Sequence, residues 1–386
     1  MKDGIINIYK PEGVTSNDVI YMLRNILRIK KLGHTGTLDP LATGVLPILI
    51  NKGTRVASYM DIDFKEYRCT LILGVSTDTL DVMGEVTEKT DEEIILEEEK
   101  VKEGLDTFLG LIDQIPPMYS AVRINGRKLY SYMHSAPDAE IEAVMKKIKP
   151  RQVFIEDITL DEMGIIDREN IKYPVKEAFI SQIPFITFTV KCSKGTYIRS
   201  ICRDLSDFLG YPGTMLSLER TASGEFRKEN SVDVNMLKEL AIKEGLAEIR
   251  EDGKFRGLGE IGETIPPVLE KYILPLDYPL KAFGKVVVDS EMRRKFIDGW
   301  HLSFRDIRVV KEPEYDMPVK KEELRDANPD SESNHHGSYP GLKVKDEYLG
   351  AYCIYDEEDT FLGVSIYSDI YKKLVADKVL IRDDNI

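Results

Sequence analysis

Segments with the alternating pattern of β-strands are mixed with helical segments along this chain, and that mixture limits its fold class. A predicted strand over residues 67–73 places Tyr67, Cys69, Leu71 and Leu73 on one face. Further strands are predicted over residues 5–8, 45–50 and 185–192, and Asn125-Gly126 is typical of a tight hairpin turn. Because hairpins join antiparallel strands, the pattern favours an α+β fold with a mixed, largely antiparallel sheet over a doubly wound parallel sheet.

Apolar residues at helical spacing predict three helices. The first begins near Ser16, a suitable N-cap, and places apolar residues from Val19 to Leu27 on one face. An acidic helix is expected over residues 91–109. A third is expected over residues 197–209, with Gly210 as its C-terminal glycine.

The length of 386 residues indicates more than one domain. We expect a larger unit over residues 1–275 and a smaller, β-rich unit over residues 276–386. Candidate strands of the smaller unit lie at 285–289, 349–355 and 361–366. Residues 250–275 are rich in glycine and charge and are predicted to be linker-like. Residues 311–345 are polar and hold four prolines, which predicts a disordered insertion around His335 and His336 rather than a metal site.

The composition excludes several classes of protein. A hydrophobic share of 42% and a charged share of 31% exclude a wholly disordered chain. A membrane-spanning helix is also excluded, because no run of about 18 apolar residues occurs. The first eight residues lack a long apolar segment and are expected to form a strand, not a signal peptide. The four cysteines form no CxxC pair, so we expect core thiols in a reducing compartment and no zinc site.

The charge is distributed unevenly. The net charge of −14, taken alone, argues against nucleic-acid binding. However, residues 1–60 hold eight Lys/Arg and four Asp/Glu, whereas residues 61–118 hold five and sixteen. A basic face on an acidic body is compatible with RNA binding.

Residues 33–44 contain three glycines and a proline around Asp39, and they have neither strand nor helical periodicity. Asp39 precedes Pro40, which restrains its backbone, and the glycines permit close approach of a ligand. A carboxylate held in this way fits a nucleophile or a general base, but from spacing alone an Asx turn or a cap is the favoured interpretation. A phosphate-binding loop is excluded because Val45 and Leu46 follow Gly44 where lysine and Ser/Thr are required. A glycosidase would need a second carboxylate, for which Asp78 and Asp81 are candidates.

The stretch Gly33-His34-Thr35-Gly36-Thr37-Leu38-Asp39-Pro40-Leu41-Ala42-Thr43-Gly44 closely resembles the catalytic motif of the TruB family of tRNA pseudouridine-55 synthases. Other motifs of that family follow in order. They are similar to residues 4–16, 65–67, 77–84, 116–121, 126–130, 192–200 and 216–221, so the resemblance spans roughly residues 4–245. Residues 276–386 resemble, more weakly, the PUA-like RNA-binding domain that follows the catalytic domain. Glu219 departs from the pattern, because the family often has a second arginine there.

The resemblance implies isomerisation of a uridine in the T-loop of tRNA, with a flipped base and no metal or other cofactor. It implies that Asp39 is the nucleophile, that Tyr67 stacks on the base and that Arg199 pairs with Asp39. Attack on the base, attack on the sugar and proton removal at the sugar all remain open to Asp39. The implied substrate-binding residues are His34, Leu218, Lys10, Thr35, Gly36, Thr37, Lys194 and Tyr197.

The resemblance also implies a cytoplasmic monomer that binds the T-arm of tRNA, and the acceptor end through the C-terminal unit. No membrane or nucleotide cofactor is expected as a partner. Candidate phosphate contacts are Arg24, Arg28, Lys30, Lys31, Arg123, Arg127, Lys128 and Lys194. The alternative function is a tRNA-binding or tRNA-folding module without essential catalysis.

Overall fold

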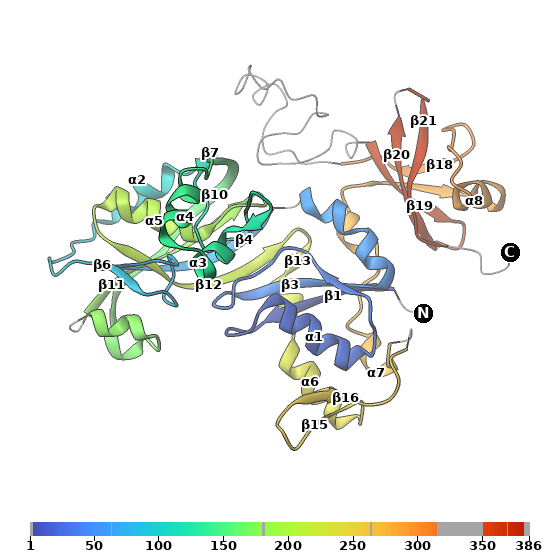
Figure 1. Ribbon diagram of the computed structural model, residues 1–386. Coiled ribbons are helices and arrows are strands. Elements are labelled where there is room, and N and C mark those ends of the chain that lie inside the picture. The colour runs from blue at the N-terminus through green and yellow to red at the C-terminus, as the bar shows by residue number, and fades with distance from the viewer. Residues whose placement is uncertain are drawn as a thin grey trace.

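A ten-stranded sheet forms the body of the molecule in the computed structural model, which describes residues 3–62, 64–179, 182–262, 265–314, 350–368 and 370–381 (Figure 1). Eight strands form its main path, and β13 and β2 pair with β12 and β3 at the side. In spatial order the path is β14 (Val232–Asp233), β1 (Gly4–Lys10), β3 (Thr43–Ile50), β12 (Gly213–Ser223), β4 (Lys65–Leu73), β11 (Gln182–Cys192), β10 (Arg151–Asp167) and β7 (Gly110–Gln114). The side strands are β2 (Leu32–His34) and β13 (Phe226–Arg227).

Most pairs in this sheet are antiparallel. The parallel pairs are β1 with β14 and β3 with β12. The predicted α+β class with a mixed, largely antiparallel sheet is therefore confirmed, and so are the strands predicted over residues 5–8, 45–50, 67–73 and 185–192. The core is built on this sheet, from side chains such as Leu71, Phe188 and Ile201 that are fully buried.

The N-cap of helix α1 (Ser16–Leu27) lies one residue earlier than the sequence suggested. Thr15, not Ser16, is the N-cap: its side chain accepts from the Asp18 N–H, and the Asp18 carboxylate accepts from the Thr15 N–H, which is a capping box. Ser16 instead lies in the first turn, fully buried. α5 (Ile198–Leu209) ends at Gly210 in the left-handed conformation, as predicted.

Two further predictions about local structure were wrong. The acidic helix predicted over residues 91–109 is shorter in the structure and covers only Glu98–Asp106 (α2). Within this helix, Val101, Gly104 and Leu105 are the buried residues. The linker-like stretch 250–275 instead contributes to folded structure, with strand β16 (Phe255–Gly257) pairing with β15 (Ala247–Ile249). Ile265 and Leu269, the latter in helix α7 (Pro267–Glu270), lie in the main core.

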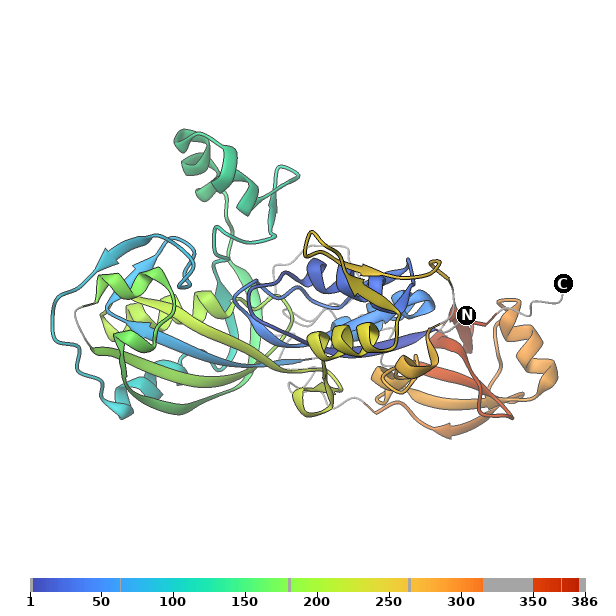
Figure 2. The ribbon, with the colours of Figure 1, turned by 90° about the horizontal axis from the view of Figure 1, so that it is seen from below.

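A hairpin subdomain projects from the body, as Figure 2 shows for α3 (Leu129–Ser135) and α4 (Asp138–Met145). Its strands are β8 (Arg123–Ile124) and β9 (Arg127–Lys128), and the predicted turn between them has positive φ at Asn125 and Gly126, 52° and 80°. Val122, Leu129 and Val144 form a small core of its own. The remaining elements of the body are β5 (Val75–Thr77), β6 (Val86–Lys89), α6 (Val234–Lys243) and short 3₁₀ turns at Asn51–Arg55, Ala57–Ile62, Arg168–Asn170, Pro174–Ala178 and Lys228–Asn230.

The C-terminal part carries a second, five-stranded sheet in the order β18 (Arg308–Lys311), β17 (Gly284–Val288), β19 (Ala351–Asp356), β20 (Phe361–Ser368) and β21 (Lys373–Val379). α8 (Ser290–Ile297) packs on it, after a 3₁₀ turn at Tyr278–Leu280. The predicted β-rich character is confirmed. Residues 315–349, which include most of the predicted insertion and His335-His336, lie outside the described residues.

Candidate active site

The loop between β2 and β3 carries Asp39, and backbone hydrogen bonds fix its shape. The Gly13 N–H donates to the Pro40 carbonyl at 2.8 Å, and the Ala42 N–H donates to the Asp39 carbonyl at 3.1 Å. The buried Ser16 hydroxyl accepts from the Leu38 N–H at 2.9 Å. The first turn of α1 therefore supports the loop on one side, while the Asp39 side chain stays 39% exposed.

Lys10 supports the same loop from inside the protein. Its side chain is fully buried, and its ammonium donates to the carbonyls of Pro11, Val14 and Pro40 at 2.9, 2.7 and 3.3 Å. Burial lowers the pKa of Lys10 to about 8, although the nearby carboxylates of Asp39 and Glu12 oppose the shift. Lys10 was predicted to bind substrate, but it does not line the cavity described below, so its position is that of a support.

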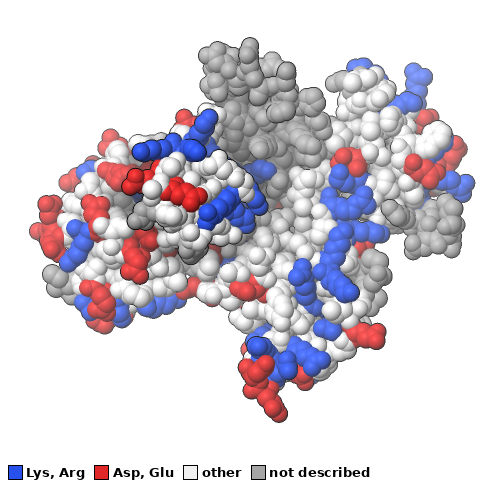
Figure 3. All heavy atoms as spheres, viewed as in Figure 1, with Lys and Arg blue, Asp and Glu red and all other residues white. Residues whose placement is uncertain are grey.

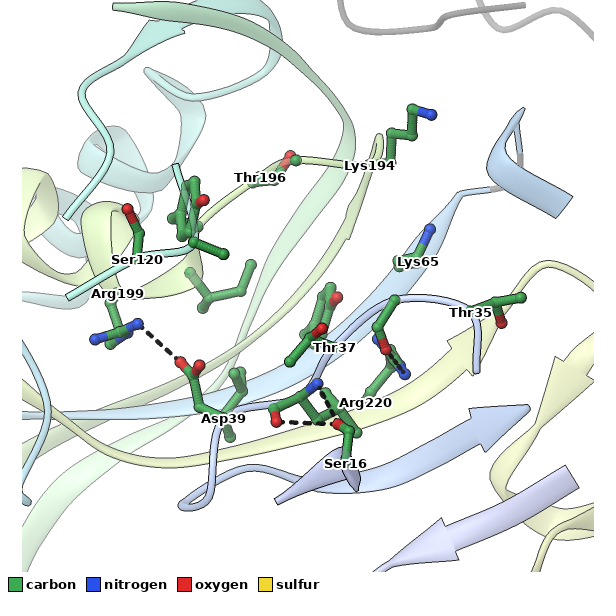
Figure 4. Close-up of a pocket in the computed structure, with 18 of the residues that line it drawn as sticks. Ser16, Thr35, Thr37, Asp39, Lys65, Ser120, Lys194, Thr196, Arg199 and Arg220 are labelled. Atoms are coloured by element: carbon green, nitrogen blue, oxygen red, sulfur yellow. Dashed lines mark hydrogen bonds and ion pairs between the residues drawn. The ribbon is translucent and has the colours of Figure 1, made fainter. Parts of the chain in front are cut away.

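Arg199, at the start of α5, holds the Asp39 carboxylate. Its Nη2 lies 2.9 Å from Asp39 Oδ2, and the arginine side chain is 6% exposed. Two backbone carbonyls accept from the same guanidinium, Thr79 at 2.8 Å and Tyr119 at 2.9 Å. Figure 4 shows Asp39 and Arg199 pointing toward one another across the pocket. A guanidinium fixed in this way orients the adjacent carboxylate.

A second carboxylate shares this arginine. Asp81 Oδ2 lies 3.6 Å from Arg199 Nη1, and burial raises the pKa of Asp81 while Arg199 opposes the rise. Asp78, the other candidate for a second carboxylate, instead accepts from the Tyr119 hydroxyl at 2.8 Å. Asp81 does not line the cavity, so it adds charge behind Arg199 rather than a reacting group.

Tyr67 and Leu218 come from neighbouring strands, β4 and β12, and both are 8% exposed in the wall of a cavity of about 990 Å³. Burial raises the pKa of Tyr67, and the positive charge of Arg220 opposes the rise. The cavity also contains Asp39 and Arg199, so the structure brings the three predicted catalytic residues together. Apart from Lys10, the other predicted substrate-binding residues also line this cavity. They are His34, Thr35, Gly36, Thr37, Lys194 and Tyr197.

Three buried polar atoms in this wall have no hydrogen-bond partner within the described part of the chain. They are His34 Nδ1, Thr35 Oγ1 and Ser120 Oγ. Burial also lowers the pKa of His34, so its imidazole is held toward the neutral form. Unpaired buried polar atoms cost free energy, which makes them natural contacts for a polar substrate.

The predicted phosphate contacts lie in different surroundings. Lys128 and Lys194 line the cavity, and Arg24, Lys30, Lys31 and Arg123 are exposed, although Arg123 also donates to the Gly126 carbonyl at 2.8 Å. Arg28 and Arg127 have structural partners: Arg28 donates to the Gly259 carbonyl, and Arg127 donates to the Ser131 carbonyl at 2.6 Å. In Figure 3, basic side chains form a band between the body and the C-terminal part, whereas acidic ones gather over the part that holds α2 and β6. The basic and acidic regions expected from the sequence are therefore separate on this face.

Arg220 and Lys65 were not predicted, yet both are buried in the cavity wall. Arg220 follows Leu218 by two residues on a strand, so both side chains leave the same face of the sheet, and that spacing was the available signal. Glu219, on the opposite face, accepts from the Tyr9 hydroxyl at 2.6 Å and pairs with Lys228 at 2.7 Å. It therefore has local partners and no place in the cavity.

No group of three or more His, Cys, Asp or Glu side chains suited to a metal ion occurs among the residues that the structure describes. In the same residues, no helix is long and apolar enough to cross a membrane. Cys69, Cys192, Cys202 and Cys353 are all buried free thiols, as predicted for core residues.

Comparison with known proteins identifies relatives over most of the chain. The family model described as TruB family pseudouridylate synthase (N terminal domain) matches residues 24–198, and a model described as tRNA pseudouridylate synthase B C-terminal domain matches residues 199–281. Proteins named tRNA pseudouridine synthase B are 37% identical over 77% of this chain in Clostridium novyi (84% of that protein) and 32% identical over 97% in Clostridium kluyveri (98% of that protein).

The fold also occurs in solved structures. One chain of an H/ACA RNP bound to a substrate RNA is similar with a TM-score of 0.59 and 20% identity, covering 99% of this chain and 86% of that one. A chain of a Cbf5-Nop10-Gar1 complex gives a TM-score of 0.59 at 21% identity, covering 98% of this chain and 85% of that one. At this level of identity the similarity shows the fold.

Proposed function

This chain belongs to the TruB family of pseudouridylate synthases, and from that premise we propose how the cavity around Asp39 converts a tRNA uridine to pseudouridine. The enzyme is an isomerase that acts on uridine in tRNA. Its target is uridine 55 in the T-loop. The observation that carries the assignment of the site is the Asp39–Arg199 pair, at 2.9 Å, in a cavity that also holds Tyr67.

Substrate binding requires the target base to leave its stack in the loop. Flipping costs a few kcal/mol, which the cavity has to offset. The Tyr67 ring stacks on the flipped uracil, a contact worth about 1–3 kcal/mol, and Leu218 closes the apolar wall. His34 and Thr35 meet the RNA loop with buried polar atoms that have no partner among the described residues.

The reaction exchanges one bond between base and sugar for another. The N1–C1′ bond breaks, the base turns in the pocket, C5 bonds to C1′, and C5 loses a proton while N1 gains one. Asp39 is the nucleophile, and Arg199 holds its carboxylate in place in the cavity. The cavity volume of about 990 Å³ leaves room for the base to turn.

The two domains have different tasks in tRNA binding. Residues 1–275 form the catalytic domain, and residues 276–386 form a PUA-like domain that binds the acceptor end of tRNA. Lys128 and Lys194 lie in the wall of the cavity, and they bind phosphates of the T-arm beside it. The enzyme works as a cytoplasmic monomer without a cofactor, and the four free thiols fit a reducing compartment.

The test is tritium release from a tRNA transcript labelled at C5 of uridine. We expect about one equivalent of tritium per tRNA from the wild type, because C5 loses its hydrogen when it replaces N1 in the bond to C1′. Asp39→Ala should release none. Both proteins should bind the transcript in a parallel filter-binding measurement. Binding by the wild type without release would instead favour a tRNA-folding module, in which the Asp39 loop serves no reaction.

A further inference from the structure

Arg220 is a buried cation for which the reaction just described has no use. Its side chain on β12 is fully buried, and a guanidinium in such a place is costly unless its donors are paired. Its Nε donates to the Val45 carbonyl at 2.7 Å, and its Nη2 donates to the Gly36 carbonyl at 3.2 Å. The second of these bonds reaches into the loop that carries Asp39.

The other neighbour of Arg220 is Tyr67. The two residues are direct partners in the antiparallel pairing of β4 with β12, so their side chains leave the same face of the sheet. Both line the cavity. The positive charge of the guanidinium lowers the pKa of Tyr67 against the effect of burial, as expected for two groups that face each other across neighbouring strands.

A hydrogen bond between these two groups can have only one direction. A guanidinium has donors and no acceptor, so the Tyr67 oxygen must accept. The phenol proton is then left for another acceptor. Since Tyr67 lies in the cavity wall, the polar groups of a bound uracil or ribose are suitably placed acceptors.

One rigid group therefore connects the two walls of the site. The space around the connection is limited: a Cβ added at Gly36 would lie 3.2 Å from Arg220 Nη1 and 3.4 Å from Lys65 Cε, and Gly36 has a φ of +78°. A planar guanidinium can hold two acceptors at a fixed angle, whereas a lysine ammonium at the end of a flexible chain cannot.

We propose that Arg220 is a positioning residue for the isomerisation, which holds the Tyr67 phenol as a hydrogen-bond acceptor and the Gly36 carbonyl of the Asp39 loop with one guanidinium. The phenol is thereby directed to donate its own proton to the substrate. This inference rests on the proposed function, because the reaction of tRNA uridine supplies the readout.

The experiment compares Arg220→Lys with Arg68→Lys. Arg68 is the residue after Tyr67 on β4, points to the opposite face and pairs with Asp161, so it is a matched control outside the cavity. We expect Arg220→Lys to lower the single-turnover rate of pseudouridine formation by about 100-fold, the size of effect known for misplaced reacting groups, with the dissociation constant for tRNA unchanged. Arg68→Lys should react at the wild-type rate.

A double-mutant cycle identifies the group through which Arg220 acts. Tyr67→Phe should reduce the rate, and Arg220→Lys added to Tyr67→Phe should cost far less than it does in the wild type, because its main partner is already gone. Full additivity of the two losses would overturn the proposal. An equal loss of tRNA affinity and rate in Arg220→Lys would also overturn it, since that pattern belongs to a general structural role.

A stability measurement keeps the proposal testable if Arg220→Lys does not fold. Tyr67→Phe retains the arginine but leaves its donor without the phenol, so its melting temperature should fall below that of Tyr21→Phe, a control at a side chain that is 60% exposed. Equal melting temperatures would mean that the phenol is no partner of Arg220. This result does not depend on activity, so it separates failure of the inference from failure of the proposed function, which would appear as an inactive wild type.

Discussion

Raising the pH should separate the stability of this enzyme from its activity, because of Lys10. The ammonium group of Lys10 is buried, and its pKa falls from 10.5 to about 8 on folding. Between these values the unfolded chain binds more protons than the folded one, so the free energy of unfolding increases as pH rises. The shift corresponds to about 3 kcal/mol at most, since one pKa unit is worth about 1.4 kcal/mol.

The effect on the reaction has the opposite sign. The charged ammonium has three N–H donors, and three carbonyls accept them. A neutral amine has two donors, so the longest contact, 3.3 Å to the Pro40 carbonyl, is the one expected to be lost. Pro40 follows Asp39 directly, and displacement of a reacting group by about 1 Å can cost about 100-fold in rate. We therefore expect the rate of isomerisation to fall as pH rises through about 8.

The assay is the single-turnover rate on a tRNA transcript between about pH 6 and about pH 10, with urea unfolding of the same samples. Lys10→Met is the control, because methionine has a similar length and does not titrate. The wild type should show the fall in rate near pH 8 and a gain in stability relative to Lys10→Met over the same range. A fall of the same size and midpoint in Lys10→Met would refute the reasoning, since another group would then be titrating.

Three further predictions concern the charge, the loop and the nucleophile. Asp39→Asn should abolish tritium release with little change in tRNA affinity, and loss of both together would mean that Asp39 has a structural role. Gly44→Ala should be more destabilising in urea unfolding than Gly210→Ala: both glycines have positive φ, which costs about 1–3 kcal/mol, but a Cβ at Gly44 would also lie 2.2 Å from the Arg220 carbonyl oxygen, whereas the Cβ at Gly210 meets nothing within 4 Å. The logarithm of tRNA affinity should fall linearly with the logarithm of salt concentration despite the net charge of −14, and a flat response would argue against phosphate contacts by Lys128 and Lys194.

Local sequence patterns predicted the strands better than the ends of the helices. Residues 67–73 were predicted correctly because one face of β4 is buried, which forces apolar residues to every second position. The acidic helix was predicted too long because Ile94 and Ile95 continue the apolar spacing of Val101 and Leu105, although Ile95 is 66% exposed. Spacing alone does not tell an apolar residue that faces the core from one that faces water.

The site was predicted where its residues are adjacent in the sequence and missed where strand pairing creates it. The glycines and proline around Asp39 marked the loop, and the resemblance to a known family added Tyr67 and Arg199. Asp81 was a candidate second carboxylate and Arg220 lies two residues after Leu218, but their places in the site were not predicted. The position of Arg220 opposite Tyr67 and that of Asp81 behind Arg199 depend on strand register and on the packing of α5. Lys10 was assigned to the substrate for a similar reason: a lysine next to a loop motif does not reveal that its ammonium points inward.

Three buried cations from distant parts of the sequence hold the Asp39 loop. Lys10 donates to the Pro40 carbonyl, Arg220 donates to the Gly36 carbonyl, and Arg199 pairs with the Asp39 carboxylate. They are only three of the 53 Lys and Arg residues, but all three are buried and act on a single loop, and an interaction inside the protein is stronger than in water. The loop can reach its final shape only after β1, β12 and α5 have assembled around it. The Asp39 carboxylate is therefore oriented before tRNA arrives, so the binding free energy of the RNA can be used to flip the base rather than to build the site.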